Sequence, residues 1–136
     1  FNYFSHTQNI DTRFLITDIV RAIKNKEVFK TSVDNIVRDF ITPPDFYNLI
    51  QAIIDAKSTN IALDCYTKNP VSKFDLLSEL KNKFGLIYDF DENINTIDAT
   101  GAKVNYYSTN KISGNIKYMP DNTSLDGIIQ EMNCVL

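Results

Sequence analysis

Arg38 is the residue of this sequence best placed to bind an anion. It lies between a short β-branched run at residues 35–37 and the start of an amphipathic helix near Pro44. Rigid elements on both sides would hold its planar guanidinium, which can then contact a phosphate or a carboxylate through two parallel hydrogen bonds. An ion pair with Asp39 or Asp45 is the alternative interpretation, and the residue types alone favour neither.

The element that follows Arg38 is predicted to be a helix. Pro44 suits a first helical turn, and Asp45 places negative charge at the positive end of the helix dipole. Apolar residues recur at spacings of three and four, which predicts one buried stripe. The stripe consists of Phe46, Leu49, Ile50, Ile53 and Ile54.

A second anion-binding position is predicted at Arg13. The residues that follow it have a helical pattern, with Leu15, Ile19, Ala22 and Ile23 on one face. Asp11 or Thr12 can cap this helix, and its first N–H groups would then point outward beside Arg13, an arrangement that suits anions. The alternative is a surface arginine at a helix start, and the anion site is preferred by a narrow margin.

Further segments continue an alternating α/β pattern. Short strands are expected at residues 27–31 and 86–90, and a buried strand at residues 60–66. Ser72 and Thr123 each precede an acidic residue by three positions, which predicts two capped helices, and Gly85 fits a helix C-terminus. The predicted buried stripes are Phe74, Leu77, Leu80 and Phe84 in the first helix and Leu125, Ile128, Ile129 and Met132 in the second.

Three motifs resemble the extended short-chain dehydrogenase/reductases, the NAD-dependent epimerases and dehydratases of nucleotide-linked sugars. Val-Arg-Asp-Phe-Ile at residues 37–41, followed by Asp45 and an apolar helix, is similar to the family element Arg-Asp-Phe/Tyr-Ile-x-x-x-Asp. Phe-Asn-Tyr-Phe at residues 1–4 resembles the family segment Arg-x-Phe-Asn-x-x-Gly. Ser-x-x-Lys at residues 108–111, followed by Tyr-x-Pro at 118–120, is similar to the C-terminal pattern.

The resemblance implies roles for three residues. In this family the arginine of the first motif holds the substrate diphosphate, which assigns that role to Arg38. The asparagine of the second motif hydrogen-bonds the sugar-phosphate, which assigns Asn2. Several members carry Lys or Asn beside the diphosphate where Arg13 stands. Many members have a second diphosphate-binding arginine before the C-terminal pattern. The nearest cation to that place in this sequence is Lys103, in a region where the similarity is loose.

The fold implied is a small α/β substrate-binding lobe, with short strands alternating with amphipathic helices and the Rossmann half absent. Residues 1–136 would then be the C-terminal substrate-binding portion of a nucleotide-sugar epimerase/dehydratase. The intact parent would use NAD or NADP, held by the absent half, for epimerisation, dehydration or reduction of a nucleotide-diphosphate sugar, and would be a homodimer. The portion alone would be inactive and would hold no cofactor. A free-standing, non-catalytic α/β binding or interaction module is the alternative, and the sequence upstream of Phe1 would discriminate between them.

No catalytic, cofactor or metal residue is predicted within the chain. The glycines are scattered and form no Gly-rich turn for a dinucleotide. Tyr107 and Lys111 have the spacing of the family's catalytic pair, but that pair belongs before Asn2 in family order, so the match is attributed to chance. His6, the lone histidine, is expected to be solvated. Residues 89–100 superficially resemble a calcium loop, but the strict glycine and glutamate positions hold other residues.

Bulk composition excludes other classes. The net charge of −3 argues against a nucleic-acid surface, which needs clustered Lys and Arg. No apolar run approaches the roughly 20 residues that span a bilayer, so no membrane association is expected. Cys65 and Cys134 have no motif spacing and are expected to be free thiols in a reducing, cytoplasmic compartment.

Overall fold

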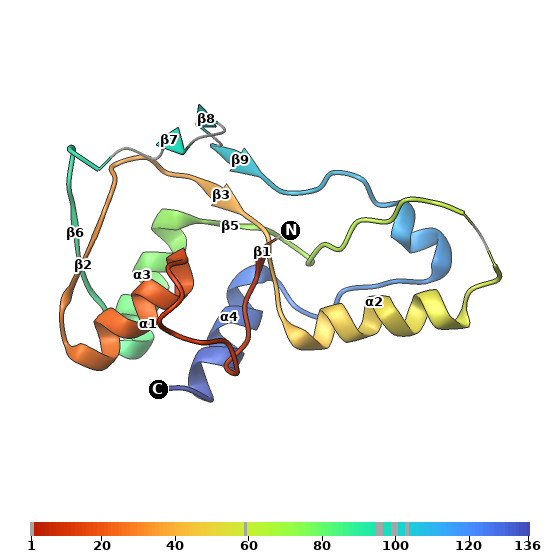
Figure 1. Cartoon of the computed structure of the whole chain (residues 1–136), viewed down its shortest axis with the longest axis horizontal. Coiled ribbons are helices and arrows are strands. Elements are labelled where there is room, and N and C mark those ends of the chain that lie inside the picture. The colour runs from red at the N-terminus through yellow and green to blue at the C-terminus, as the bar shows by residue number, and fades with distance from the viewer. Residues whose placement is uncertain (1, 59, 95–96, 99–100, 103) are drawn as a thin grey trace.

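A computed structural model of the chain describes residues 2–58, 60–94, 97–98, 101–102 and 104–136. Short strands alternate with helices along the chain, as predicted (Figure 1). In chain order the elements are β1 (Asn2–Tyr3), α1 (Leu15–Asn25), β2 (Val28–Thr31), β3 (Val37–Arg38), β4 (Phe40–Ile41), α2 (Pro43–Asp55), β5 (Val71–Ser72), α3 (Lys73–Phe84), β6 (Ile87–Phe90), β7 (Ile97–Asp98), β8 (Gly101–Ala102), β9 (Asn105–Tyr106), the 3₁₀ helix η1 (Ile112–Ile116) and α4 (Ser124–Asn133).

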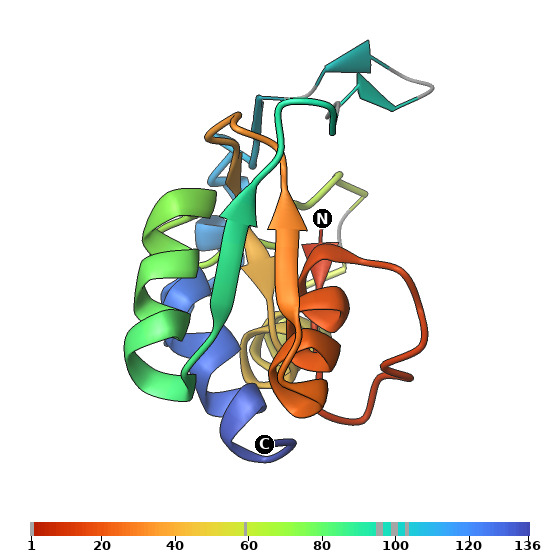
Figure 2. The same cartoon turned by 90° about the vertical axis from the view of Figure 1, so that its left-hand side faces the viewer.

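The strands pair in small groups. β1 is parallel to β4, with Asn2 opposite Phe40, and β2 is parallel to β6. β3 lies between an antiparallel β5 and a parallel β9. Figure 2 shows β2 and β6 side by side, flanked by α1 and α3. Parallel neighbours need long connections, so these pairings bring together segments that are distant in the sequence.

Two apolar clusters hold the elements together. The larger joins α1, α3, α4 and β4, and the smaller lies beside α2. Fully buried side chains of the larger cluster include Ile19, Val20, Leu76, Leu77, Leu80, Ile128 and Met132, and the smaller contains Ile41, Leu49, Cys65, Tyr66 and Tyr118.

Local signals at the helix ends are mostly confirmed. The side chains of Ser72 and Thr123 each accept a hydrogen bond from the backbone N–H three residues later, both at 3.1 Å. Gly85 ends α3 with φ of 70°, a left-handed conformation that glycine adopts without strain. The predicted cap of α1 is wrong, because Phe14 holds the cap position instead of Asp11 or Thr12 and makes no side-chain cap hydrogen bond.

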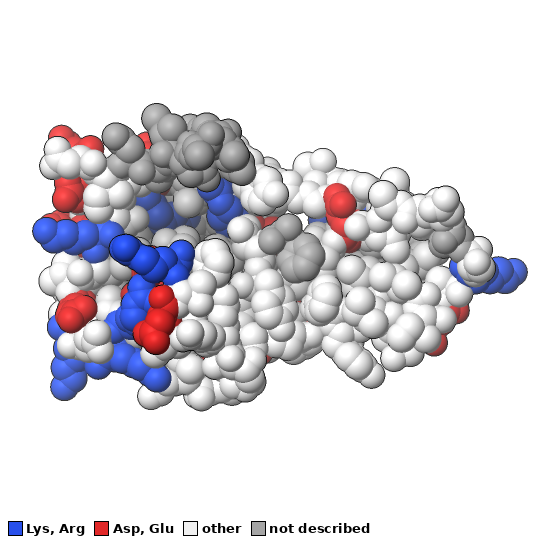
Figure 3. All heavy atoms as spheres, viewed as in Figure 1, with Lys and Arg blue, Asp and Glu red and all other residues white. Residues whose placement is uncertain are grey.

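Three predictions of buried apolar segments are wrong in part. Within α2 only Leu49 of the expected stripe is buried, whereas Ile50, Ile53 and Ile54 are 39%, 43% and 70% exposed. Residues 60–66 form no strand, and in α3 Lys73 is buried while Phe74 is exposed. Spacing identifies which face of an element is apolar, but it does not identify what covers that face. In the view of Figure 3 the surface over α2 is mostly uncharged.

In the described part of the chain, each helix is too short or too polar to cross a bilayer. The same residues contain no group of three or more His, Cys, Asp or Glu side chains arranged to hold a metal ion. Lys103 and part of the calcium-loop segment lie outside the described residues.

Gly127 sets the close approach of α4 to the start of α2. A Cβ atom built at Gly127 would lie 2.8 Å from Oγ1 and 2.9 Å from Cγ2 of Thr42, a side chain that is 1% exposed. Thr42 cannot retreat into solvent, so Gly127→Ala is expected to destabilise the protein by about 1–3 kcal/mol despite the higher helix propensity of alanine. Urea denaturation monitored by circular dichroism measures this change. Ser78→Ala, at an exposed position of α3, is the control, and equal stability of Gly127→Ala and wild type would contradict the prediction.

Candidate functional site

Asn2 and Arg38 line one pocket of about 360 Å³. β1 carries Asn2, and its parallel pairing with β4 places Asn2 opposite Phe40, two residues beyond Arg38. The first turn of α1 forms another part of the lining, and a first turn leaves N–H groups without an intrahelical acceptor. The remaining walls are mainly apolar, and the full lining is Asn2, Tyr3, Phe4, Gln8, Phe14, Leu15, Ile16, Thr17, Ile36, Arg38 and Phe40.

Arg38 is half-buried and is held in place by several contacts. Its Nη1 donates hydrogen bonds to the backbone oxygens of Val37, at 2.9 Å, and Val104, at 3.1 Å. Its Cζ lies 5.9 Å from the ring centroid of Tyr106, within the range of a cation–π contact. The arginine is therefore positioned at the pocket by β3 and by β9 on its neighbouring edge.

The alternative partners of Arg38 have structural roles of their own. Asp39 accepts hydrogen bonds from the N–H and hydroxyl of Thr67, at 3.1 and 2.5 Å, and from the hydroxyl of Ser124, at 2.8 Å. Asp45 is fully buried and accepts hydrogen bonds from the N–H groups of Asp121, at 2.6 Å, and Asn122, at 3.3 Å. Burial raises the pKa of Asp45 above its ordinary value. Both carboxylates thus tie this strand–helix junction to the segment that leads into α4.

Asn2 and Arg13 differ in how well the structure joins them to Arg38. The side-chain amide of Asn2 donates to the backbone oxygen of Asp39 at 3.4 Å, which keeps it beside β4. Arg13 is exposed and is not part of the pocket lining, although the next residue, Phe14, is. The geometry therefore unites Asn2 and Arg38 and leaves Arg13 outside the pocket.

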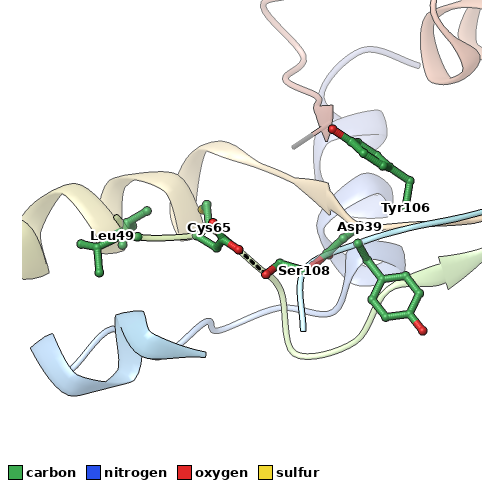
Figure 4. Close-up of a pocket in the computed structure, with 8 residues that line it drawn as sticks. Asp39, Leu49, Cys65, Tyr106 and Ser108 are labelled. Atoms are coloured by element: carbon green, nitrogen blue, oxygen red, sulfur yellow. Dashed lines mark hydrogen bonds between the residues drawn. The ribbon is translucent and has the colours of Figure 1, made fainter. Parts of the chain in front are cut away.

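Another pocket, of about 330 Å³, lies beside Asp39 and contains the buried thiol of Cys65 (Figure 4). Cys65 Sγ lies 3.7 Å from the hydroxyl of Tyr118, which in turn donates to the backbone oxygen of Tyr66 at 2.6 Å. Burial raises the pKa of Cys65 and also raises that of Tyr118. A buried thiol with a raised pKa is a poor nucleophile, which argues against covalent chemistry at Cys65.

The two other candidates from the sequence have different surroundings. Tyr107 lies in an extended exposed segment before η1, and Lys111 Nζ lies 3.6 Å from the ring centroid of Tyr66. Tyr107 and Lys111 are therefore not stacked one helical turn apart, as an acid/base pair of this kind requires. His6 is paired with α4, because its ring Nδ1 lies 2.7 Å from Oε2 of Glu131 and its backbone N–H donates to the same oxygen at 2.8 Å.

The described glycines do not fit a dinucleotide site. Such a site needs glycines in a turn between a strand and a helix N-terminus, where the backbone can approach a pyrophosphate. Gly85 ends a helix, Gly101 begins the short strand β8, Gly114 lies in η1 and Gly127 lies within α4. No residue described in this chain is therefore assigned to a nicotinamide cofactor.

Sequence reasoning missed Tyr106, which contacts Arg38, and Lys73, which is bonded to the connection that leads to β3. Tyr106 was not singled out, because its contact with Arg38 depends on the pairing of β3 with β9. Lys73 was placed at a predicted helix start and given no role, but it is buried, with 2% of its surface exposed. Its place at the first position after the Ser72 cap was visible in the sequence, whereas its burial was not.

Comparison with solved structures identifies the fold. UDP-glucuronic acid 4-epimerase from Bacillus cereus, in complex with UDP-glucuronic acid and NAD, superposes with a TM-score of 0.78 at 16% identity over 98% of this chain. The chain has part of an epimerase fold. UDP-glucose 4-epimerase from Thermotoga maritima, with UDP-glucose, gives a TM-score of 0.76 at 13% identity over 97% of the chain. UDP-N-acetylglucosamine 4-epimerase from Bacillus cereus gives a TM-score of 0.70 at 13% identity over 98% of the chain.

The match to the epimerase fold covers nearly all of this chain but less than half of each of those proteins. The covered shares are 42% of the UDP-glucuronic acid and UDP-glucose epimerases and 45% of the UDP-N-acetylglucosamine epimerase. No family model matches the chain, and no curated protein sequence matches it either. The predicted fold class, a small α/β lobe of the extended short-chain dehydrogenase/reductase type, is confirmed by the structural similarity.

Proposed function

We propose that this chain is the C-terminal substrate-binding portion of an NAD(P)-dependent nucleotide-sugar epimerase, dehydratase or reductase. In this proposal the chain belongs to the extended short-chain dehydrogenase/reductases and binds the diphosphate of a nucleotide-diphosphate sugar. The observation that carries the proposal is the convergence of Asn2 and Arg38 on one pocket at the first turn of α1. These are the two residues that resemble the family's phosphate-binding motifs, and they are distant in the sequence.

The chemistry of the pocket suits a nucleoside diphosphate. Arg38 supplies a fixed cation with a planar array of donors, Asn2 supplies an amide, and the first turn of α1 supplies the positive end of a helix dipole. The apolar walls provide a surface for a base or ribose, while a diphosphate would lie toward Arg38. Arg13, exposed beside the pocket, would contribute a longer-range attraction.

In the intact parent, the cofactor would accept and return a hydride, and residues outside this chain would perform the proton transfers. The part of the molecule described here would hold the remote phosphates and so orient the sugar. The mostly uncharged face of α2, with exposed Ile50, Ile53 and Ile54, supports a covered surface in the parent. A cytoplasmic, homodimeric parent is part of the proposal.

Titration calorimetry with UDP, UMP and uridine tests the proposal. If the diphosphate is the group that the pocket holds, UDP should bind at least about tenfold more tightly than UMP, and uridine should bind more weakly still, because each phosphate adds charge-assisted hydrogen bonds. Equal affinity for all three, or no binding of UDP at millimolar concentration, would overturn it. The chain incubated with UDP-glucose and NAD should show no turnover.

A further inference from the structure

Lys73 is a buried cation outside the proposed diphosphate pocket. It is the first residue of α3 and is only 2% exposed. Its Nζ donates hydrogen bonds to the backbone oxygen of Ser32, at 2.6 Å, and to the hydroxyl of Ser32, at 3.0 Å. Ser32 is itself 1% exposed, so the ammonium lies inside the protein and its partners are protein atoms.

The same helix start holds the segment that leads from Ser32 to Arg38. The backbone N–H of Lys73 donates to the oxygen of Ile36 at 2.8 Å, and the N–H of Phe74 donates to Oδ1 of Asn35 at 3.1 Å. Ile36 lines the proposed diphosphate pocket together with Arg38. The first turn of α3 therefore fastens both ends of the connection between β2 and β3.

The strand pairing carries this restraint to Arg38. β5, which ends at Ser72 directly before Lys73, pairs with β3 so that Val71 lies opposite Arg38. A shift of the first turn of α3 would thus move β3, the strand that presents the arginine. Burial lowers the pKa of Lys73, and the charge of Asp34 opposes that shift. Such a desolvated cation is costly unless each of its bonds is made.

We propose that Lys73 is a positioning residue, whose bonds to Ser32 fix the connection between β2 and β3 and so hold Arg38 in the geometry that a diphosphate requires. An apolar residue could fill the same volume, but it would leave the buried oxygen of Ser32 without this donor. The inference rests on the proposed function, because it concerns the same pocket. It adds a residue that lies outside the pocket lining and would act on the diphosphate only through the position of Arg38.

The test uses Lys73→Met, which keeps the length and volume of the stem and removes the ammonium. The matched control is Lys83→Met on the same helix, an exposed lysine whose pairing with Glu79, at 3.7 Å, is a surface contact. Amide hydrogen exchange of residues 33–38 should become about tenfold faster in Lys73→Met and stay unchanged in Lys83→Met. UDP affinity measured by calorimetry should fall roughly tenfold in Lys73→Met, since small misplacements of a binding group are costly.

A double substitution separates positioning from general destabilisation. In an Arg38→Lys background, which already lacks the planar fork, Lys73→Met should have little further effect on UDP affinity. An equal loss in both backgrounds, or unchanged exchange at residues 33–38, would overturn the role of Lys73 even if UDP binds to the wild type. Absence of UDP binding by the wild type would overturn the proposed function, and the exchange data would still report on the restraint of residues 33–38.

Discussion

Arg38→Ala is expected to weaken UDP binding at least about 100-fold, which corresponds to roughly 2.7 kcal/mol. The arginine supplies a fixed cation at the pocket, and charge-assisted bidentate contacts to phosphate are among the strongest polar contacts available to a protein. Arg38→Lys keeps the charge but loses the fork, so a loss of about tenfold is expected. Titration calorimetry measures both changes.

Arg13→Ala is the comparison for this prediction. Arg13 is exposed and outside the pocket lining, so its removal should cost only about two- to threefold in UDP affinity. Because Arg38 also bonds the backbone of Val37 and Val104, a thermal melt must show that Arg38→Ala remains folded. Wild-type affinity in folded Arg38→Ala would contradict the assignment of the diphosphate to this pocket.

Asp39→Ala is expected to destabilise the fold by about 3–4 kcal/mol. Asp39 is 5% exposed, and its carboxylate accepts three hydrogen bonds from Thr67 and Ser124. Its removal takes the acceptor from the N–H of Thr67 and from the hydroxyl of Ser124 inside the protein, where an unmade bond costs most, whereas the hydroxyl of Thr67 can still donate to the backbone oxygen of Asn69 at 2.9 Å. A melting temperature lower by roughly 10 °C is the expected readout.

Asp89→Ala, at an exposed position of β6, provides the matched control for Asp39→Ala and should melt within about 2 °C of the wild type. The melting temperature of Asp39→Asn should lie between those of Asp39→Ala and Asp89→Ala. The amide keeps one acceptor oxygen but replaces the other with an NH₂ group, a donor that faces donors. If Asp39→Ala had the same melting temperature as the wild type, the buried hydrogen bonds of Asp39 would have no net stabilising role.

Most features that depend on neighbouring residues were predictable from the sequence, although the cap of α1 was placed at Asp11 or Thr12 and lies at Phe14. The caps at Ser72 and Thr123 and the left-handed Gly85 involve groups within a few positions of each other, so the residue types specify them. The junction around Arg38 was predictable for the same reason, since a β-branched run followed by proline defines both of its sides. The pairing of Asn2 with this junction came from family resemblance and not from local pattern.

Features that depend on distant partners were not predictable. The burial of Lys73 follows from its bonds to Ser32, 41 positions earlier, and nothing in the local pattern near Lys73 indicates that partner. The apolar face of α2 was identified correctly, but its exposure depends on which surface meets it. Residues 60–66 have the composition of a strand, and without a paired neighbour in the described structure they remain irregular.

The parallel pairing of β1 with β4 has a thermodynamic consequence. Asn2 and Arg38 converge only through that pairing, so a denatured chain offers a diphosphate no equivalent site. By mass action, a ligand that recognises the native state alone shifts the folding equilibrium, by about 2.7 kcal/mol when its concentration is 100 times its dissociation constant. Under the proposed function, substrate binding and folding of this lobe would be linked, and saturation with nucleotide would protect its N-terminal strand from fraying.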